Sequence, residues 1–168
     1  MNGNLGVPTG GTMVTNYVAV TGVTAQAATT FTATPVGTSA AISFMVKGKA
    51  FTKATISGGT TPTTDAITGA AHTALAASEG NVYVLGLDAD GNIKLAGGNV
   101  QKLDAAGNFV SRSEFPAMPD TIAPFAYIVC KNGSTGSAWT IGSSNWNATG
   151  MTATPVNIMA LPSRPQVS

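Results

Sequence analysis

The chain has 168 residues, of which 43% are hydrophobic and only 9% are charged, and its formal net charge is +1. This length suits one domain, and the hydrophobic fraction argues against global disorder. The eight Lys and Arg residues are scattered, with only Lys47, Lys49 and Lys53 close together, which argues against a nucleic-acid partner. Because so few charges oppose self-association, the composition favours a lasting oligomer or a place in a larger assembly.

Residues 1–40 are rich in Thr, Ala, Gly and Val and carry no charge. Short strands are predicted over residues 13–20 and 31–35, and the apolar positions show no helical period. Because this segment is poor in large apolar groups, it gains little free energy by folding on itself. Two interpretations therefore stay open: an extended N-terminal arm that is ordered by contact with something else, or ordinary edge strands.

Strand signals become clear in the next part of the chain. Residues 42–46 alternate between large apolar and smaller or polar side chains, and residues 51–56 follow a Lys-Gly-Lys turn, which predicts a hairpin or a bulged pair. Residues 65–79 are ambiguous, because Asp65 and several alanines favour a helix whereas Gly69 and nearby threonines weaken it. We expect an irregular or extended path there, with at most one short helix.

A short internal repeat follows. Residues 87–93, Leu-Asp-Ala-Asp-Gly-Asn-Ile, return at 103–109 as Leu-Asp-Ala-Ala-Gly-Asn-Phe. In each copy the Asp can bond the backbone of its own turn, and the Gly-Asn pair accepts the left-handed conformation. A Gly-Gly pair separates the copies, so that three connections join four strands. The repeat therefore predicts an antiparallel meander over about residues 82–112.

Both tryptophans lie in the carboxy-terminal part, within residues 115–165, where prolines disfavour helix. The apolar run at 125–130 predicts a strand that is covered on both faces, by a second sheet or by a neighbouring subunit. A turn is predicted at 132–136, with residues 138–141 returning as the second strand of a hairpin. The candidate core or subunit-interface anchors are Phe125, Tyr127, Val129, Trp139 and Trp146.

No residue pattern identifies a catalytic, cofactor-binding or metal site. Asp88, Asp90 and Asn92 alternate as at the start of a calcium-binding loop, but the glycine and the closing glutamate of an EF-hand are not in their places. His72 is the only histidine, and no nucleophile motif accompanies it. The single cysteine, Cys130, excludes an internal disulfide and has the apolar surroundings of a small buried side chain. We expect no enzyme activity, no cofactor and no metal.

A glycan-binding role stays open as an alternative. Tyr127, Trp139 and Trp146 could form a stacking platform for sugars, and the loops around Trp146 are rich in Ser, Asn and Gly. Aromatic rings this close to apolar strands are more often core or interface anchors.

Together these patterns predict a mainly β protein. Residues 41–168 are expected to form an antiparallel sandwich or barrel-like domain, and residues 1–40 an extended N-terminal arm or edge strands. Neither a secretory signal nor an apolar run long enough to span a bilayer is recognisable, so we expect synthesis in a cytoplasm and no membrane partner.

Two segments carry a resemblance to a known class of protein. The first is Phe115-Pro116-Ala117-Met118-Pro119-Asp120-Thr121-Ile122-Ala123-Pro124-Phe125, and the second is the ending Leu161-Pro162-Ser163-Arg164-Pro165-Gln166. With the Trp-bearing stretch between them and the low charge, the chain resembles small structural proteins of tailed bacteriophage virions. The resemblance implies a capsid decoration, head-fibre or related accessory component of the virion. It also implies a homo-oligomer, most simply a trimer, that contacts the major capsid protein or other virion proteins.

Overall fold

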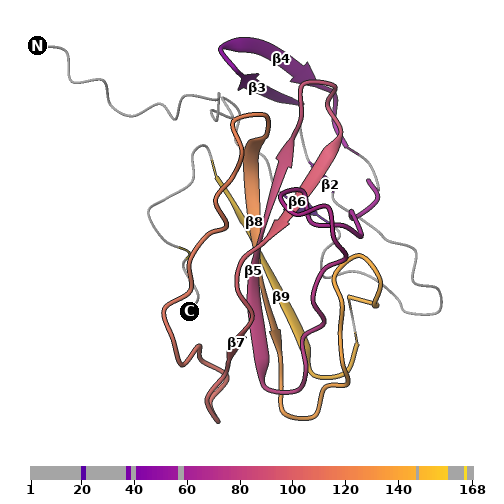
Figure 1. Cartoon of the computed structure of the whole chain (residues 1–168). Coiled ribbons are helices and arrows are strands. Elements are labelled where there is room, and N and C mark those ends of the chain that lie inside the picture. The colour runs from indigo at the N-terminus through magenta and orange to yellow at the C-terminus, as the bar shows by residue number, and fades with distance from the viewer. Residues whose placement is uncertain are drawn as a thin grey trace, which may run out of the picture.

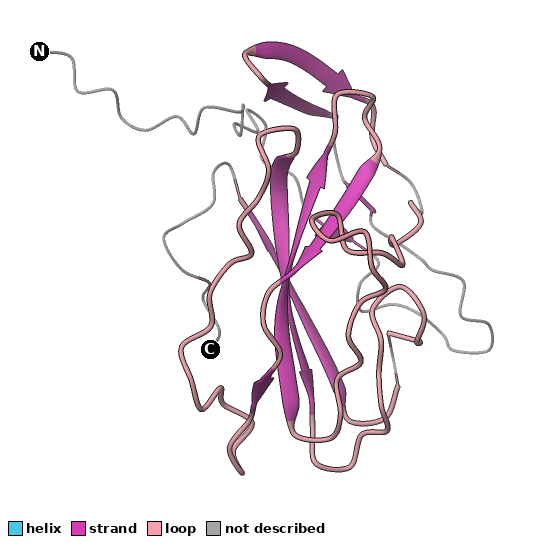
Figure 2. Cartoon of the chain, in the orientation of Figure 1, coloured by secondary structure: helices cyan, strands magenta, loops and turns pink. Residues whose placement is uncertain are grey.

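A computed structural model describes residues 20–21, 37–38, 41–56, 59–146, 148–158 and 165. These residues form antiparallel strands and contain no helix (Figure 2), which confirms the prediction of a mainly β fold. The predicted strands at 13–20 and 31–35 lie outside the described residues, apart from Val20. The strands are β1 (Val20–Thr21), β2 (Gly37–Thr38), β3 (Ile42–Val46), β4 (Lys49–Lys53), β5 (Glu79–Leu87), β6 (Ile93–Gly97), β7 (Gln101–Lys102), β8 (Ala123–Asn132) and β9 (Met151–Asn157).

The central sheet is built around two long, neighbouring strands, β5 and β8 (Figure 1). Its strand order is β6-β5-β8-β9, and β7 pairs with the start of β5 beyond the end of β6. Nearly every residue of β5 and β8 is buried. The run at 125–130 is therefore covered on both faces, as its continuous apolar pattern predicts.

A β-bulge adjusts which side chains of β8 face the main core. The register shifts between Leu85 and Gly86, so that Leu85 lies opposite Ala126 and Gly86 opposite Pro124, which leaves Phe125 as the extra residue. Side chains normally alternate between the two faces of a strand, but a bulge lets two adjacent residues share one face. Both Phe125 and Ala126 consequently join the same core cluster.

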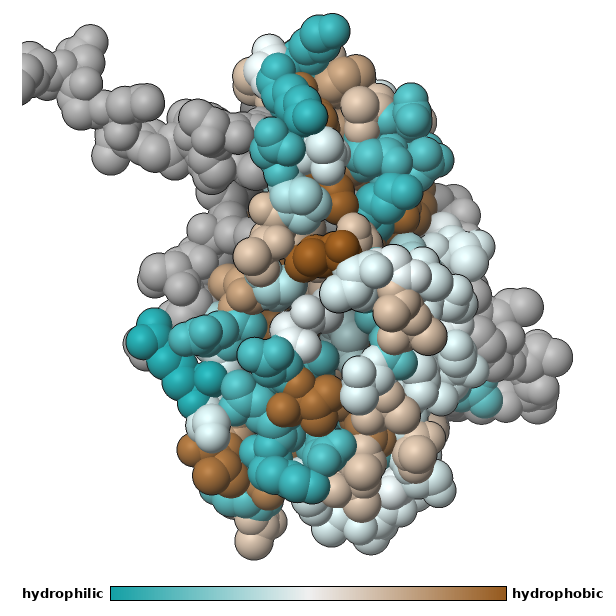
Figure 3. Space-filling model, viewed as in Figure 1, coloured by the Kyte–Doolittle hydropathy of each residue, from teal (hydrophilic) through white to brown (hydrophobic). Residues whose placement is uncertain are grey.

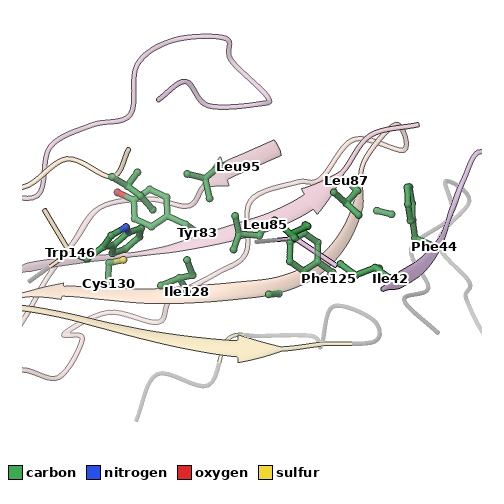
Figure 4. Packing of buried hydrophobic residues seen from close by; sticks show 14 of the residues in the cluster. Ile42, Phe44, Tyr83, Leu85, Leu87, Leu95, Phe125, Ile128, Cys130 and Trp146 are labelled. Atoms are coloured by element: carbon green, nitrogen blue, oxygen red, sulfur yellow. The ribbon is translucent and has the colours of Figure 1, made fainter. Parts of the chain in front are cut away.

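Two apolar clusters lie on opposite faces of the sheet. The larger one is covered by the loops that carry Leu75, Trp139, Ile141 and Trp146 and, at one end, by the β3–β4 hairpin. Figure 4 shows its side chains along the sheet, with Ile42 and Phe44 of β3 at that end. The smaller cluster has a wall of sheet residues, Val82, Val84, Tyr127 and Val129, and is covered by Phe109, Phe115, Met118, Val156 and Ile158. The fold is thus sandwich-like, although loops make up much of both covering layers.

The β3–β4 hairpin is present as predicted, although its second strand covers Lys49–Lys53 and not residues 51–56. Its turn consists of Lys47 and Gly48, whose φ angles are 48° and 76°. Two successive positive φ values are the mark of a type I′ turn, which suits the twist of a two-residue hairpin. Within the hairpin, Phe44 and Phe51 lie opposite each other and stack with ring centroids 5.6 Å apart. Residues 66–68 form only a turn, in agreement with the expected irregular path.

Two predictions of strand pairing were wrong. Residues 138–141 do not return along β8, because β9 takes that place and Trp139 forms only an isolated bridge with Leu75. The predicted meander is also incomplete. The β5–β6 hairpin is present, but β7 pairs back with β5, and the expected fourth strand is reduced to a single bridge between Leu103 and Phe109.

Candidate functional site

The two tryptophans lie in the loop of residues 133–150, which joins β8 to β9 and closes on itself. Its ends meet where the Gly133 N–H donates to the Gly150 carbonyl at 2.8 Å. Trp139 is 1% exposed and Trp146 4% exposed, and their ring centroids are 5.3 Å apart. The indole N–H of Trp139 donates to the carbonyl of Asn145 at 2.8 Å, so the ring also fixes the shape of its own loop.

The five predicted anchors are all buried within the chain itself. Phe125, Trp139 and Trp146 belong to the larger cluster, whereas Tyr127 and Val129 lie on the opposite face of the sheet. A single stacking platform of Tyr127 with both tryptophans is therefore wrong, because the sheet separates the rings and none of the three is more than 4% exposed.

Asn132, at the end of β8, was not recognised from the sequence as more than a turn residue. Its side chain is fully buried, and its Nδ2 group donates to the carbonyls of Leu75, Ala76 and Ser137 at 3.0, 3.2 and 2.8 Å. One amide group thus joins the end of the central strand to two separate loops. Gly136 must be a glycine for this contact, since a Cβ there would collide with the Asn132 side chain.

The two copies of the internal repeat form the same turn. In the first copy, Asp88 Oδ1 accepts hydrogen bonds from the N–H groups of Asp90 and Asn92 at 3.0 and 2.8 Å. In the second, Asp104 Oδ1 accepts from Ala106 and Asn108 at 2.9 and 2.8 Å. The aspartates therefore bond their own backbone, as their spacing predicts. Among the described residues, no three His, Cys, Asp or Glu side chains are placed to hold a metal ion together.

A hollow of about 540 Å³ opens at the edge of the sheet, between the end of β6 and the start of β7. The loop at 65–73 and the segment at 114–117 meet around it, so that both covering layers contribute. Its walls include His72, Tyr83, Asn81 and Phe115. The side chains of Asp65, His72, Tyr83 and Glu114 are the titratable groups that line this hollow.

His72 is buried against Tyr83, with ring centroids 5.6 Å apart in an edge-on arrangement. Burial lowers the pKa of His72 below its ordinary value of 6.5, although the nearby charge of Asp65 and a hydrogen bond with the Thr64 backbone oppose the shift. Among the described residues, its Nε2 atom has no hydrogen-bond partner. The imidazole is therefore neutral near pH 7.

Asp65 fastens the covering loop to the sheet edge. Its Oδ1 accepts from the N–H groups of Ile67 and Thr68, both at 2.9 Å, and its Oδ2 accepts from the Gly97 N–H at 2.7 Å. Burial raises the pKa of Asp65, but these backbone donors more than offset it and hold the pKa below the ordinary value of 3.8. Because both oxygens are engaged, the geometry describes a loop anchor and gives His72 no orienting carboxylate.

These ionisable groups make the fold sensitive to acid. The pKa of His72 and the pKa values of Asp65 and Asp88 are lower in the folded chain than in an unfolded one, so the unfolded state binds more protons as the pH falls. We expect the melting temperature to be constant near pH 7, to fall as the pH drops below the ordinary histidine value of 6.5, and to fall further below 3.8.

Calorimetry across this pH range measures both stages. In Asp65→Asn the fall in melting temperature below pH 3.8 should become smaller, while the fall below pH 6.5 remains. A melting temperature that is unchanged between pH 7 and pH 3 contradicts the assigned hydrogen bonds.

Comparison of the chain with protein-family models, curated proteins and solved structures finds no match. In the described part of the chain, no helix is long and apolar enough to cross a membrane. Cys130 is fully buried, and burial raises the pKa of its thiol. The described residues thus form a central sheet whose two faces are covered largely by loops.

Proposed function

We propose that this chain is a structural component of a tailed-bacteriophage virion, which decorates or projects from the capsid and stabilises it through contacts between subunits. The supporting observation is where the resembling segment at 115–125 lies. Phe115 packs edge-on against Tyr127 with ring centroids 5.0 Å apart, Met118 packs against the same cluster, and the segment then leads into β8. Phe115 and Met118, two of the residues that carry the resemblance, therefore help to cover one face of the sheet.

The surface suits a role in assembly. Ion pairs among the described residues are few and peripheral, as in Lys47 with Asp120 and Lys102 with Glu79. On the face in Figure 3, apolar residues form separate islands among hydrophilic and near-neutral ones. Among the described large apolar side chains, Ile67 and Val110 are the exposed ones, at 45% and 66%. When another protein binds to such a surface, few charged groups have to lose their water, so the free-energy cost of desolvation is small. The proposed partners are further copies of the chain, most simply in a trimer, and the major capsid protein.

Mass photometry of the purified chain tests self-association, and sedimentation with capsids of the phage that encodes it tests attachment. We expect a homotrimer and saturable binding to assembled capsids, with capsids that unfold at higher temperature when the chain is bound. A stable monomer that neither sediments with capsids nor raises their unfolding temperature would exclude the proposal.

A receptor- or glycan-binding module of a phage tail or fibre is the second candidate. Because the aromatic rings are buried, this candidate is supported instead by a hollow of about 380 Å³ on the β8–β9 loop. Ser143, Ser144, Asn145 and Thr149 help to line it. Hydroxyl and amide groups of this kind suit hydrogen bonding to sugars. A glycan array probed with the intact oligomer tests it: binding that Ser144→Trp abolishes supports this candidate, and an array without binding removes it.

A further inference from the structure

β9 forms one edge of the central sheet. β9 stands last in the strand order, and among the described strands it pairs only with β8. No Asp, Glu, Lys, Arg or His occurs anywhere between Asn132 and Ser163. Proteins usually protect such an edge with charged side chains or proline, because its free N–H and C=O groups can pair with another strand, and in β9 only Pro155 is of this kind.

The hydrogen-bond pattern identifies which backbone groups face outward. The Ile158 N–H donates to the Phe125 carbonyl at 3.1 Å, and Ala126 lies opposite Asn157. In an antiparallel pair this geometry makes Asn157 a non-hydrogen-bonded position, and the positions alternate along the strand. Ala153, Pro155 and Asn157 therefore direct their backbone groups away from β8. Pro155 fits this assignment, because a proline has no N–H to donate and is tolerated where the N–H would face outward.

The edge accordingly offers two complete donor and acceptor positions, at Ala153 and Asn157, with an acceptor alone at Pro155 between them. An incoming strand could form hydrogen bonds at Ala153 and Asn157 and to the Pro155 carbonyl, although the Pro155 ring takes the place of a donor and hinders the partner at that one position. The side chains of Thr152 and Thr154 are exposed on this strand, and both are uncharged.

The same chain brings a candidate segment close to β9. β1, at Val20–Thr21, lies beside β9 without pairing to it. Residues 13–19, Met-Val-Thr-Asn-Tyr-Val-Ala, lead directly into β1, are uncharged and are rich in β-branched and aromatic residues. At about 3.3 Å per residue an extended segment of this length spans roughly 23 Å, as much as β9 itself. Attachment through β1 also gives it a high effective concentration at the edge.

We propose that residues 13–19 of this chain pair through their main chain with the outer edge of β9 and extend the central sheet by one strand. This pairing satisfies the outward N–H groups of Ala153 and Asn157 and places the N-terminal segment against the sheet. It does not depend on the proposed function, because a chain that never meets a capsid could still pair in this way.

Amide hydrogen exchange in the full chain, followed by NMR, tests the pairing. We expect the amides of Ala153 and Asn157 to exchange at least about tenfold more slowly than the exposed amide of Asn99, the factor that about 1.4 kcal/mol of pairing supplies. In Val18→Pro, which removes a donor from the N-terminal segment, this protection should fall while the amides of Thr154 and Val156 keep theirs. The matched control Ala27→Pro should change neither.

A second variant tests the pairing from the other side. Ala153→Pro removes an outward N–H and leaves the donors that face β8 in place, so the amides of residues 13–19 should exchange faster in it. Rapid exchange of Ala153 and Asn157 in the unaltered chain overturns the proposal. The slow exchange of Ala153 and Asn157 could also disappear on dilution, with an oligomer present at high concentration. That result would show that the added strand comes from a second copy, and it would overturn the assignment to the same chain.

Discussion

Replacing Trp139 with alanine is expected to lower the free energy of unfolding by about 3 to 5 kcal/mol, the range for removing a buried aromatic side chain. The ring is 1% exposed and packs against Trp146, so the variant leaves a cavity at the centre of the larger cluster. It also removes the N–H donor that holds the carbonyl of Asn145. Chemical denaturation with fluorescence from the remaining tryptophan measures the loss.

Two controls separate the contributions of the ring. Trp139→Phe keeps an aromatic ring but loses the hydrogen bond to Asn145, and its cost should be clearly smaller than that of the alanine variant. Val110→Ala alters a side chain that is 66% exposed and should change stability by no more than about 0.5 kcal/mol. Equal stability of Trp139→Ala and the unaltered chain would mean that the ring is not buried in solution.

Local patterns were sufficient where the structure depends on neighbouring residues. Alternation at 42–46 and the Lys-Gly turn predict the β3–β4 hairpin, because the turn needs only two residues that accept positive φ. The repeated Asp turns follow from the sequence for the same reason, since each Asp bonds residues two and four positions further on. The continuous apolar run at 125–130 likewise predicts burial on both faces.

Local sequence patterns could not predict which distant segments pair with each other. Residues 138–141 and β9 are both plausible partners for β8 by composition, and the choice depends on contacts of long sequence separation. The Trp139 backbone is held by Leu75, through hydrogen bonds of 2.9 and 2.7 Å, and is therefore directed away from β8. The loop then closes between Gly133 and Gly150, which delivers β9 to the free side of β8.

The candidate site shows the same limit. The sequence identifies the anchors by their size and hydrophobicity, but it does not distinguish a core from an interface or indicate which face of the sheet each ring joins. The β-bulge at Phe125 changes the alternation, and the position of Tyr127 on the opposite face excludes the aromatic platform that was the alternative to core anchors. Asp65 and Asn132 were visible only as turn or cap residues, because their partners, Gly97 and Leu75, lie far away in the sequence.

Replacing Asn132 with alanine is expected to lower the free energy of unfolding by about 2 to 4 kcal/mol, because the carbonyls of Leu75, Ala76 and Ser137 lose their donor in a buried place. Asn132→Asp should cost more, since it directs a buried carboxylate at the same three carbonyls. The exposed Asn99→Ala is the matched control and should be nearly neutral. Denaturation curves measure all three, and an Asn132→Ala variant as stable as Asn99→Ala would show that the two loops are held to β8 by packing alone.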